Sequence, residues 1–247
     1  MPHTKESLIE HLKKEHQASP IQTYLKEIVY GGNDGIVTTF AVVAGFTGAQ
    51  AASAIPQYSF LTVLLFGLAN LSADAASMGL GNFLSLRAEK DVYKSEEDKE
   101  RHEVRTHPED EKKETIEILQ EKGFSQEDAN ALTKIYATNE NYWVSFMMNY
   151  ELEMANPSKE NPTLTALATF SSFILFGFIP LLPYLLLKDE PGVFLFSCLS
   201  TFSALVMLGV LRFRVTTGGL LRSISEIVLV GGTASTIAYL VGTFFRI

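Results

Sequence analysis

The chain contains very little cysteine and histidine, and it has no phosphate-binding glycine motif. Its single cysteine, Cys198, excludes a disulfide within the chain. Only 5 histidines are present, and the spacing of His3, His11 and His16 places them on different helical faces. We therefore expect a solvated N-terminal arm here rather than a metal site. The missing Walker-type motif argues against ATP-driven pumping by this chain.

Charge is also nearly absent from five long stretches, of which only the second contains a charged residue, Asp74. Each is close to, or longer than, the ~20 residues needed to cross ~30 Å of hydrocarbon. Buried helices of a soluble protein are the alternative, but five such runs joined by short connections leave little polar surface. We expect an all-α, polytopic membrane protein whose five membrane helices come from Ile36–Ile55, Tyr58–Leu86, Thr163–Leu187, Val193–Leu211 and Ile227–Phe245.

The charged residues instead gather in a polar stretch from Arg87 to Glu160, which holds 19 of the 28 acidic and 11 of the 20 basic residues. We expect no secretory signal, because the first 30 residues are charged and no cleavage pattern follows. If the N-terminus is cytoplasmic, 18 of the 20 Lys and Arg residues share that side, and only Lys188 and Arg246 fall outside. This asymmetry follows the positive-inside pattern.

Four parts follow from this distribution. Residues 1–30 form an N-terminal arm and an amphipathic helix at the membrane surface, because apolar residues recur there at helical spacing from Ile21 to Tyr30. Residues 31–86 hold membrane helices 1 and 2. Residues 87–160 form a cytoplasmic, acidic metal-binding domain inserted between helices 2 and 3, and residues 161–247 hold helices 3 to 5.

Local signals predict helices throughout the polar stretch. The second membrane helix has no break after Arg87, so it should continue through Glu100 and end at Thr106-His107-Pro108. Three further helices are expected: from about Pro108 to Lys122 with Gly123 as its stop, from a capping box at Ser125-Gln126-Glu127-Asp128, and from about Glu140 to Met154 before Asn156-Pro157.

The polar stretch contains two pairs of glutamates three residues apart, Glu100 with Glu103 and Glu111 with Glu114. A hairpin at Pro108 brings the pairs together, and crowded carboxylates repel one another unless a cation neutralises them. Carboxylates alone suit Mg²⁺, Ca²⁺ or Mn²⁺, whereas nearby thioethers favour softer ions such as Fe²⁺. Met147 and Met148 supply thioethers and Glu151 a further carboxylate, although glutamate-rich helices are also commonly solvated and methionines commonly pack in cores.

The membrane part has two further candidate sites. Gly31-Gly32-Asn33-Asp34-Gly35 has the composition of a turn, and Asp34 is either an N-cap or a carboxylate that attracts cations. Asn70, Asp74 and Met78 recur every four residues and so share one helical face. A carboxylate within hydrocarbon is a functional-site hypothesis, with a structural polar contact as the alternative.

Two other features of the membrane part concern prolines and a lone acid. Pro180 and Pro183 should kink the third membrane helix and free backbone carbonyls. Glu226 lies just before the fifth apolar run, near Arg212, Arg214 and Arg222. For Glu226 we favour a salt bridge with one of these arginines over a role in transport.

The motifs occur together in one order, and the whole set resembles the vacuolar iron transporter family over nearly the entire chain. The matching pieces are Gly32-Asn33-Asp34-Gly35, Ser77-Met78-Gly79 with Gly81, the glutamate pairs, Trp143-Val144 through Met147-Met148 to Glu151, Ile179-Pro180-Leu181-Leu182-Pro183-Tyr184, and Gly231-Gly232 with Gly242.

The resemblance implies a homodimer of five-helix subunits with a three-helix cytoplasmic metal-binding domain. It also implies proton-coupled export of Fe²⁺, and often Mn²⁺, from the cytosol. The metal-binding residues would be Glu100, Glu103, Glu111, Glu114, Met147, Met148 and Glu151, and the translocation path would include Asp34 and Met78. One departure is Asn70, where similar proteins commonly carry glutamate, and we expect Asp74 to take over that acidic role.

The leading interpretation is therefore a secondary transporter, an antiporter of protons and Fe²⁺ (or Mn²⁺, Zn²⁺, Co²⁺), with no enzymatic activity, prosthetic group or nucleic-acid partner. We expect it in a prokaryotic cell membrane, or in the vacuolar membrane of a eukaryote. A membrane-anchored metal sensor or buffer is the first alternative. A ferritin-like di-iron oxidase is the second, but it requires Glu-x-x-His pairs, whereas this chain has Glu-x-x-Glu.

Overall fold

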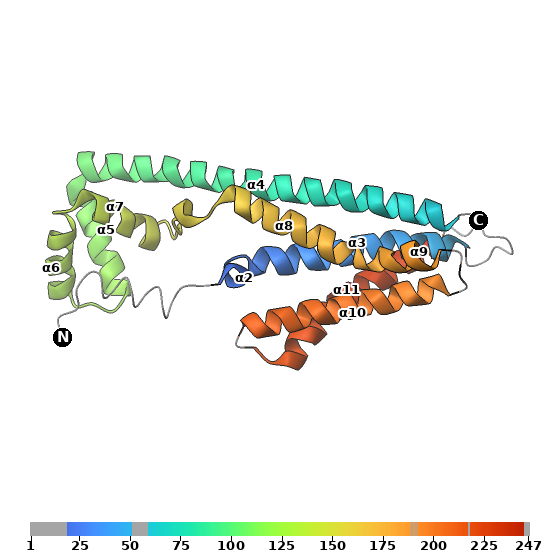
Figure 1. Ribbon diagram of the computed structural model, residues 1–247. Helices are drawn as coiled ribbons and strands as arrows, with labels where there is room; N and C mark the ends of the chain where they lie inside the picture. The colour runs from blue at the N-terminus through green and yellow to red at the C-terminus, as the bar shows by residue number, and fades with distance from the viewer. Residues whose placement is uncertain (1–18, 51–58, 189, 191, 217, 245–247) are drawn as a thin grey trace. The chain divides into compact units, whose positions relative to one another are not determined.

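The computed structural model describes residues 19–50, 59–188, 190, 192–216 and 218–244, and these residues form helices and connecting loops without any strand (Figure 1). The three histidines of the N-terminal arm lie outside the described residues, as do Ile55, Tyr58, Phe245 and Arg246 at the ends of the expected segments. The chain divides into two compact units: unit 1 comprises Met1–Asn82 with Thr163–Ile247, and unit 2 comprises Phe83–Pro162.

Unit 1 consists of long apolar helices. Four segments of the described residues are long and apolar enough to cross a membrane: Phe60–Thr106, Pro162–Leu187, Val193–Val215 and Leu220–Phe244. The elements of unit 1 are α2 Pro20–Thr23, α3 Leu25–Gln50, the first part of α4 Phe60–Thr106, α8 Pro162–Gly177, η2 Ile179–Leu181, α9 Leu182–Leu187, α10 Val193–Val215 and α11 Leu220–Phe244.

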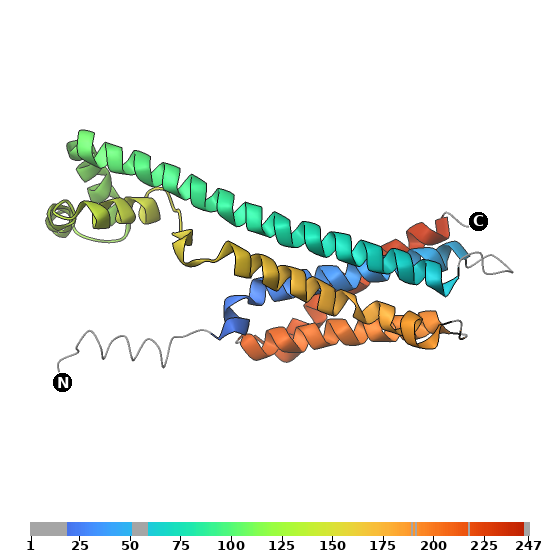
Figure 2. The same cartoon turned by 45° about the horizontal axis from the view of Figure 1, so that its top comes forward.

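Helix α3 is not among those four segments, although it packs against α10 and α11 (Figures 1 and 2). Its described length includes Lys26, Glu27, Asn33 and Asp34, which lower its mean hydropathy. Helix α3 also includes residues 25–30, and the preceding helix α2 ends at Thr23. The stretch from Ile21 to Tyr30 therefore does not form one separate amphipathic helix. The four segments agree with helices 2 to 5 of the sequence prediction.

The turn expected at Gly31 to Gly35 is not formed, because α3 continues through it without a break. Asp34 is therefore not an N-cap. A Cβ atom on Gly31 would lie 2.7 Å from the carbonyl oxygen of Thr169, and one on Gly35 would collide with the carbonyl oxygen of Phe173. The glycines thus serve close packing of α3 on the backbone of α8, which is the usual role of small residues four apart in membrane helices.

The prolines interrupt the third apolar segment as expected. Helix α8 ends at Gly177, and the chain continues as the short 3₁₀ turn η2 and then as α9. The carbonyl of Pro180, released from the helical ladder, accepts a hydrogen bond from the Ser197 hydroxyl of α10 at 2.7 Å. This bond satisfies a backbone group that apolar surroundings could not.

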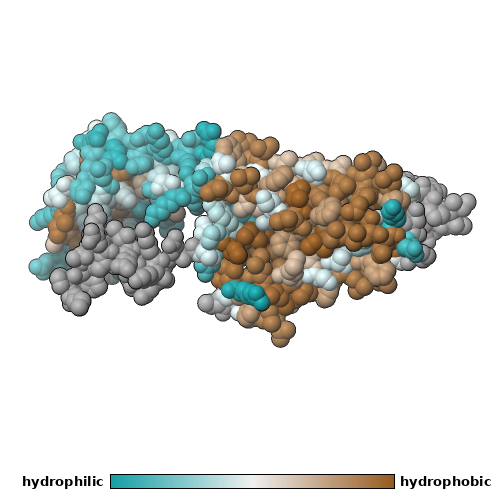
Figure 3. All heavy atoms as spheres, viewed as in Figure 1, coloured by the Kyte–Doolittle hydropathy of each residue, from teal (hydrophilic) through white to brown (hydrophobic). Residues whose placement is uncertain are grey.

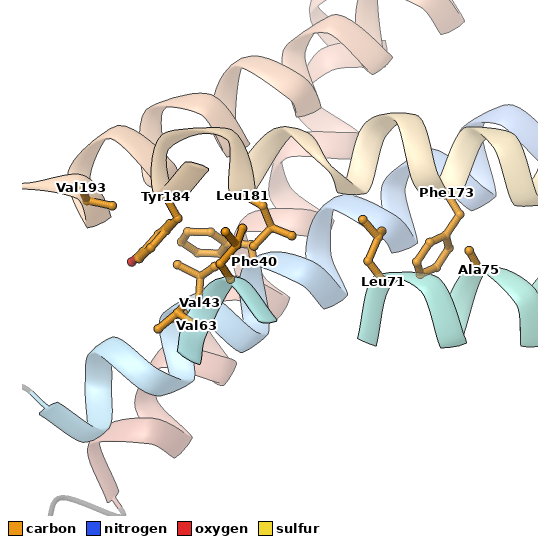
Figure 4. Close-up of a cluster of buried hydrophobic side chains, with 11 residues drawn as sticks. Phe40, Val43, Val63, Leu71, Ala75, Phe173, Leu181, Tyr184 and Val193 are labelled. Atoms are coloured by element: carbon orange, nitrogen blue, oxygen red, sulfur yellow. The ribbon is translucent and has the colours of Figure 1, made fainter. Parts of the chain in front are cut away.

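One apolar core cluster of unit 1 joins six of its elements, α3, α4, α8, η2, α9 and α10. Figure 4 shows Phe40 and Val43 of α3 near Leu181 and Tyr184, with Leu71, Ala75 and Phe173 grouped further along. The outer surface of this unit is mostly apolar (Figure 3), with leucines of several helices largely exposed: Leu65, Leu175, Leu186, Leu195 and Leu229. Such a surface requires lipid or another apolar partner around it.

Unit 2 contains the rest of α4 together with α5 Pro108–Glu121, α6 Gln126–Tyr136, α7 Glu140–Tyr150 and the turn η1 Pro157–Lys159. Helix α4 continues unbroken through Glu100 and ends at Thr106, as the sequence predicts. Gly123 adopts a φ of 97°, the left-handed conformation of a helix C-terminus. The Ser125 hydroxyl accepts the Asp128 backbone N–H at 3.1 Å, which caps α6.

Helix α7 is shorter than expected. It ends at Tyr150 rather than near Met154. The backbone N–H groups of Leu152 and Met154 turn back to the carbonyls of Met147 and Met148, at 3.2 and 2.9 Å, and Glu153 has a positive φ of 52°. The chain therefore reverses four residues earlier than the Asn156-Pro157 signal suggests, and Glu151 becomes the C-cap.

Two arginines connect α4 to α7. Arg101 and Arg105 both bind the carboxylate of Glu140, with nitrogen to oxygen distances of 3.0 and 2.7 Å. Apolar packing on Trp143, Val144 and neighbouring core residues supports the same arrangement. The start of α7 is thus fixed beside α4, which sets the position of the residues that follow along it.

Candidate metal centre

Three carboxylates converge in unit 2 from three different elements. They belong to Glu100 of α4, Glu111 of α5 and Glu151 at the C-cap of α7, and one oxygen from each lies within 4.8 Å of the others. Glu100 and Glu111 are only 3% and 5% exposed, whereas Glu151 is open to solvent. The site is therefore a pocket of oxygen ligands with two buried members and one accessible member.

The two buried carboxyl groups interact with each other. The pKa of each group is affected by the other, and Oε1 of Glu100 and Oε2 of Glu111 are buried without a hydrogen-bond partner among the described residues. Buried oxygens without donors are costly, and a cation is the group that would satisfy both.

The pKa values report the same crowding. Burial, then the charges of Glu111 and Glu151, raises the pKa of Glu100 to about 8. Burial, followed by the charges of Glu114, Glu111 and Glu103, raises the pKa of Glu151 to about 7. Burial also raises the pKa of Glu111. Divalent metal would replace these protons, because only the ionised carboxylates bind it.

The basic residues nearest in sequence do not neutralise these carboxylates. Arg101 binds Glu97 and Glu140. On α5, the ammonium groups form ion pairs on their own helix, Lys112 with Glu109 and Lys113 with Asp110. The charge of the three converging carboxylates is consequently left for protons or for a bound cation.

Met147 and Met148 are both completely buried within unit 2. The Thr115 hydroxyl lies 3.3 Å from the Met147 sulfur and accepts the Trp143 indole N–H at 2.7 Å. Thr115 follows Glu111 by one helical turn, so this network holds the sulfur of Met147 close to α5. Met147 and Met148 also belong to the core of unit 2, so the packing interpretation holds for them as well. Thr115 was missed in the sequence, although its spacing from Glu111 indicates a shared face.

The structure brings together part of the expected set. Glu103 and Glu114 are exposed and stand outside the close group of three. Their charges nevertheless raise the pKa of Glu111 and Glu151, so they lie within electrostatic range. The close contacts run between helices, from Glu100 to Glu111, rather than within each pair.

The candidate residues of unit 1 are half-buried. The Asn70 amide donates a hydrogen bond to the Asp74 carboxylate at 2.8 Å, and Met78 packs against the core one turn further along α4. Asp34 on α3 lies within electrostatic range of Asp74. Asn70 also lines a cavity of about 610 Å³ whose other walls, from α3, α4 and α11, are apolar.

The expected salt bridge of Glu226 is formed twice. Arg212 of α10 binds one oxygen of Glu226 at 2.7 Å, and Arg222 of α11 binds the other at 2.8 Å. Glu226 is thereby fully engaged in joining α10 to α11, which supports the structural interpretation over a role in transport.

Apolar helices of membrane-spanning length and a unit with crowded, unneutralised carboxylates define a multi-pass membrane protein with a candidate cation site. A family model described as the VIT family matches residues 25–243, and the chain belongs to that family. The resemblance noted in the sequence is thereby confirmed.

Several relatives are similar over nearly the whole chain. A vacuolar iron transporter of Toxoplasma gondii is 36% identical over 243 residues, covering 95% of this chain and 78% of the relative. Vacuolar iron transporter 1 of Arabidopsis thaliana is 32% identical over 235 residues, covering 95% and 90%. A vacuolar iron transporter of Plasmodium falciparum is 32% identical over 231 residues, covering 90% and 82%.

The affinity of the full-length protein for metal should increase as pH rises from 6 to 8.5. The carboxyl groups of Glu100 and Glu151, with pKa values of about 8 and 7, must lose their protons before they bind metal. Below these values, each displaced proton costs up to about tenfold in affinity per pH unit. Titration calorimetry with Mn²⁺ in buffers of different ionisation enthalpy would count the protons released.

The metal-free protein should show the opposite trend. A folded-state pKa of about 8 for Glu100, against 4.5 ordinarily, gives stability that is complete below 4.5 and lost as pH rises through 8. Thermal unfolding of unit 2 should therefore occur at lower temperature at pH 8.5 than at pH 5.5, unless metal is bound. Equal Mn²⁺ affinity at pH 6 and 8.5 would contradict this account of the site.

Proposed function

We propose that this chain is a secondary transporter that exports divalent transition metals, Fe²⁺ foremost, from the cytosol. The observation that carries the proposal is the convergence of Glu100, Glu111 and Glu151 within 4.8 Å, with two buried members. In the described part of the chain the neighbouring basic residues Arg101, Lys112 and Lys113 pair with other carboxylates. The relatives named vacuolar iron transporters supply the identity of the ion. The ion is the substrate in this proposal, and no catalytic step is involved.

The ligand chemistry favours a transition metal over Mg²⁺ or Ca²⁺. Carboxylates alone suit hard cations, whereas sulfur prefers softer ions. In this proposal Met147, whose sulfur contacts Thr115 one helical turn after Glu111, and Met148 supply thioethers to the site. Fe²⁺ is the main substrate in this proposal, with Mn²⁺, Zn²⁺ and Co²⁺ as further substrates. Glu103 and Glu114, at the exposed edge, attract the incoming ion.

Transport requires a second site within the apolar helices. Asp34, Asn70, Asp74 and Met78 form this site in the proposal, since an acid, an amide and a thioether share one face of α4 and Asp34 lies within electrostatic range. Helix α3 is membrane helix 1 in this proposal, which completes the set of five, and residues 87–160 are the cytoplasmic metal-binding domain between helices 2 and 3. Two subunits form a homodimer around the path.

Protons drive the movement in the opposite direction. Glu100 and Glu151 hold protons near neutral pH because of their raised pKa values, and metal binding releases them. Inward proton flow then resets the carboxylates along the path. The N-terminus and the acidic domain face the cytosol, as the Lys and Arg distribution indicates, in a vacuolar membrane or in a prokaryotic cell membrane.

A membrane-anchored sensor or buffer would bind metal in unit 2 without moving it. Asn70 and Asp74 argue against this, because a simple anchor needs no hydrogen-bonded carboxylate within an apolar helix. The structural alternative for Asp74 is a polar contact between helices. The bond that the structure shows instead lies within α4, from Asn70 to Asp74.

Metal-dependent proton movement in reconstituted vesicles tests the proposal. Vesicles containing the full-length protein and a trapped pH indicator should accumulate Fe²⁺ or Mn²⁺ added outside, while the lumen becomes more alkaline as protons leave. Mg²⁺ and Ca²⁺ should give neither signal, and protein-free vesicles serve as the control. Metal bound to the protein without accumulation or pH change would favour the buffer instead.

A further inference from the structure

A groove of about 710 Å³ lies on unit 1, and its lining includes none of the candidate metal residues. Its walls come from the start of α3, the end of α10 and the start of α11, which lie at the same end of the unit (Figures 1 and 2). The lining side chains include both apolar and charged residues: Leu25, Lys26, Val29, Tyr30, Asn33, Arg212, Glu226, Ile227 and Val230.

The charges at this groove do not balance. Glu226 accepts from both Arg212 and Arg222, so one carboxylate faces two guanidinium groups. Lys26 lines the same groove and forms no ion pair with any residue that the structure describes. The groove with its attached Arg222 therefore carries two positive charges in excess. Since two guanidinium groups share a single carboxylate, their remaining N–H donors are available to another anion.

Apart from the Asn33 amide and the Tyr30 hydroxyl, the rest of the groove is apolar. Leu25, Val29, Ile227 and Val230 form its walls, and Val230 is 61% exposed on the outer surface of α11. An aqueous anion such as free phosphate would gain nothing from these walls. An amphiphile with an anionic headgroup and an acyl chain matches both halves, the charges at one side and the apolar walls beside them.

We propose that this groove binds one anionic phospholipid, with its phosphate near Lys26, Arg212 and Arg222 and the first part of an acyl chain along Val29 and Val230. Basic pockets between membrane helices on the cytoplasmic side are suited to anionic headgroups. The volume lies in the range of small-ligand sites and accommodates a headgroup with part of a chain. The lipid would bridge α3 to the α10 and α11 pair.

The proposal also agrees with the orientation inferred from the charges. The last turn of α10, at the same end of unit 1, also carries Arg214, which lies outside the groove. Such residues belong at a membrane surface rich in anionic lipid. The bridging role does not depend on metal transport, so it can be tested even if the proposed transport activity is absent.

The test uses the full-length protein, stripped of lipid in detergent and then supplied with dioleoyl phosphatidylglycerol or phosphatidylcholine. Native mass spectrometry should show one phosphatidylglycerol retained per subunit and much weaker retention of phosphatidylcholine. Lys26→Gln should weaken retention about fivefold, and Lys26→Gln with Arg222→Gln about 30-fold, because each basic residue contributes a similar electrostatic increment. Both side chains are exposed, and the Arg212 to Glu226 bond remains.

Two further variants keep the test decisive. Arg214→Gln removes a charge from the same end but not from the groove, and it should leave retention within about twofold of wild type. Val230 is 61% exposed and lies outside the buried core, so Val230→Trp fills the groove from its exposed side and should abolish retention even if the charge variants fold poorly. Equal retention by wild type and Val230→Trp, equal binding of both lipids, or displacement of lipid by millimolar inorganic phosphate would overturn the proposal.

Discussion

Glu100→Gln combined with Glu111→Gln should reduce the affinity of the full-length protein for Fe²⁺ or Mn²⁺ by about a hundredfold or more. Both residues are buried, and each places an oxygen within 4.8 Å of the other's and of one from Glu151. Removing two anionic ligands leaves only exposed carboxylates, and even loss of a supporting group outside the ligand set costs about 10- to 100-fold. Titration calorimetry and metal uptake by vesicles would both measure the loss.

The same double variant should be more stable than wild type when metal is absent. At pH 8 the native site must hold carboxylates that burial and mutual repulsion disfavour, as the raised pKa of Glu100 shows. Glutamine has a similar shape and no charge, so both penalties disappear. Loss of a metal ligand should raise the unfolding temperature of the metal-free protein and lower its metal affinity. Misfolding would instead lower both the unfolding temperature and the metal affinity.

The matched control changes two exposed carboxylates of the same helix. Glu117→Gln with Glu121→Gln makes the same change in the net charge of unit 2, through two exposed carboxylates of α5, and leaves Glu100, Glu111 and Glu151 in place. Its metal affinity should stay within about twofold of wild type, since exposed charges are screened by salt. Wild-type affinity in the Glu100 and Glu111 variant would remove the basis for the proposed site.

The helices of unit 2 could be predicted because their ends depend on neighbours in the sequence. Pro108 prevents α4 from continuing, Gly123 takes the left-handed conformation after α5, and Ser125 caps α6. Each signal acts within four residues, so it can be read without knowledge of the fold. The continuity of α4 past Arg87 follows from the same rules, because nothing local interrupts it.

The glycines before the first apolar run show where such signals fail. Gly31 and Gly35 have the composition of a turn, but they lie within helix α3. Glycine is needed at both positions because the backbone of α8 approaches too closely for a side chain. That contact joins residues more than a hundred positions apart in the sequence, and no local pattern reports it. The early end of α7 has a similar cause, since the reversal after Tyr150 involves backbone bonds to Met147 and Met148 in the core.

The candidate site was predictable in its members but not in its grouping. Spacing identifies Glu100 with Glu103 and Glu111 with Glu114 as neighbours on one helix face. Tertiary packing selects one member of each pair and adds Glu151, which α7 delivers only because it ends there as a C-cap. Thr115 enters in the same way, through its contacts with Met147 and Trp143 of another helix.

Asp74→Asn should abolish metal transport and the linked proton movement while leaving metal binding by unit 2 unchanged. Asp74 is half-buried on an apolar helix, and Asn70 donates a hydrogen bond to it at 2.8 Å. The replacement amide keeps the shape and an oxygen that can accept the same bond, so the fold has little reason to change. The replacement removes the negative charge that stabilises a cation outside water. It also removes the carboxylate that would bind the returning proton.

Two comparison variants distinguish the effect of losing a charge from the effect of its position in the membrane helix. Glu190→Gln removes an exposed carboxylate outside the helices and should leave transport within about twofold of wild type, since exposed charges are screened by salt. Asn70→Glu introduced together with Asp74→Asn moves the acid one helical turn, to the position where similar proteins commonly carry glutamate, and should restore much of the transport. Metal uptake and lumenal pH in vesicles provide the measurement. If Asp74→Asn transports metal at the wild-type rate with the same pH dependence, Asp74 is a structural contact and the path must use another carboxylate. Asp34 on α3 is then the remaining candidate site residue with a carboxylate in the described part of the apolar bundle.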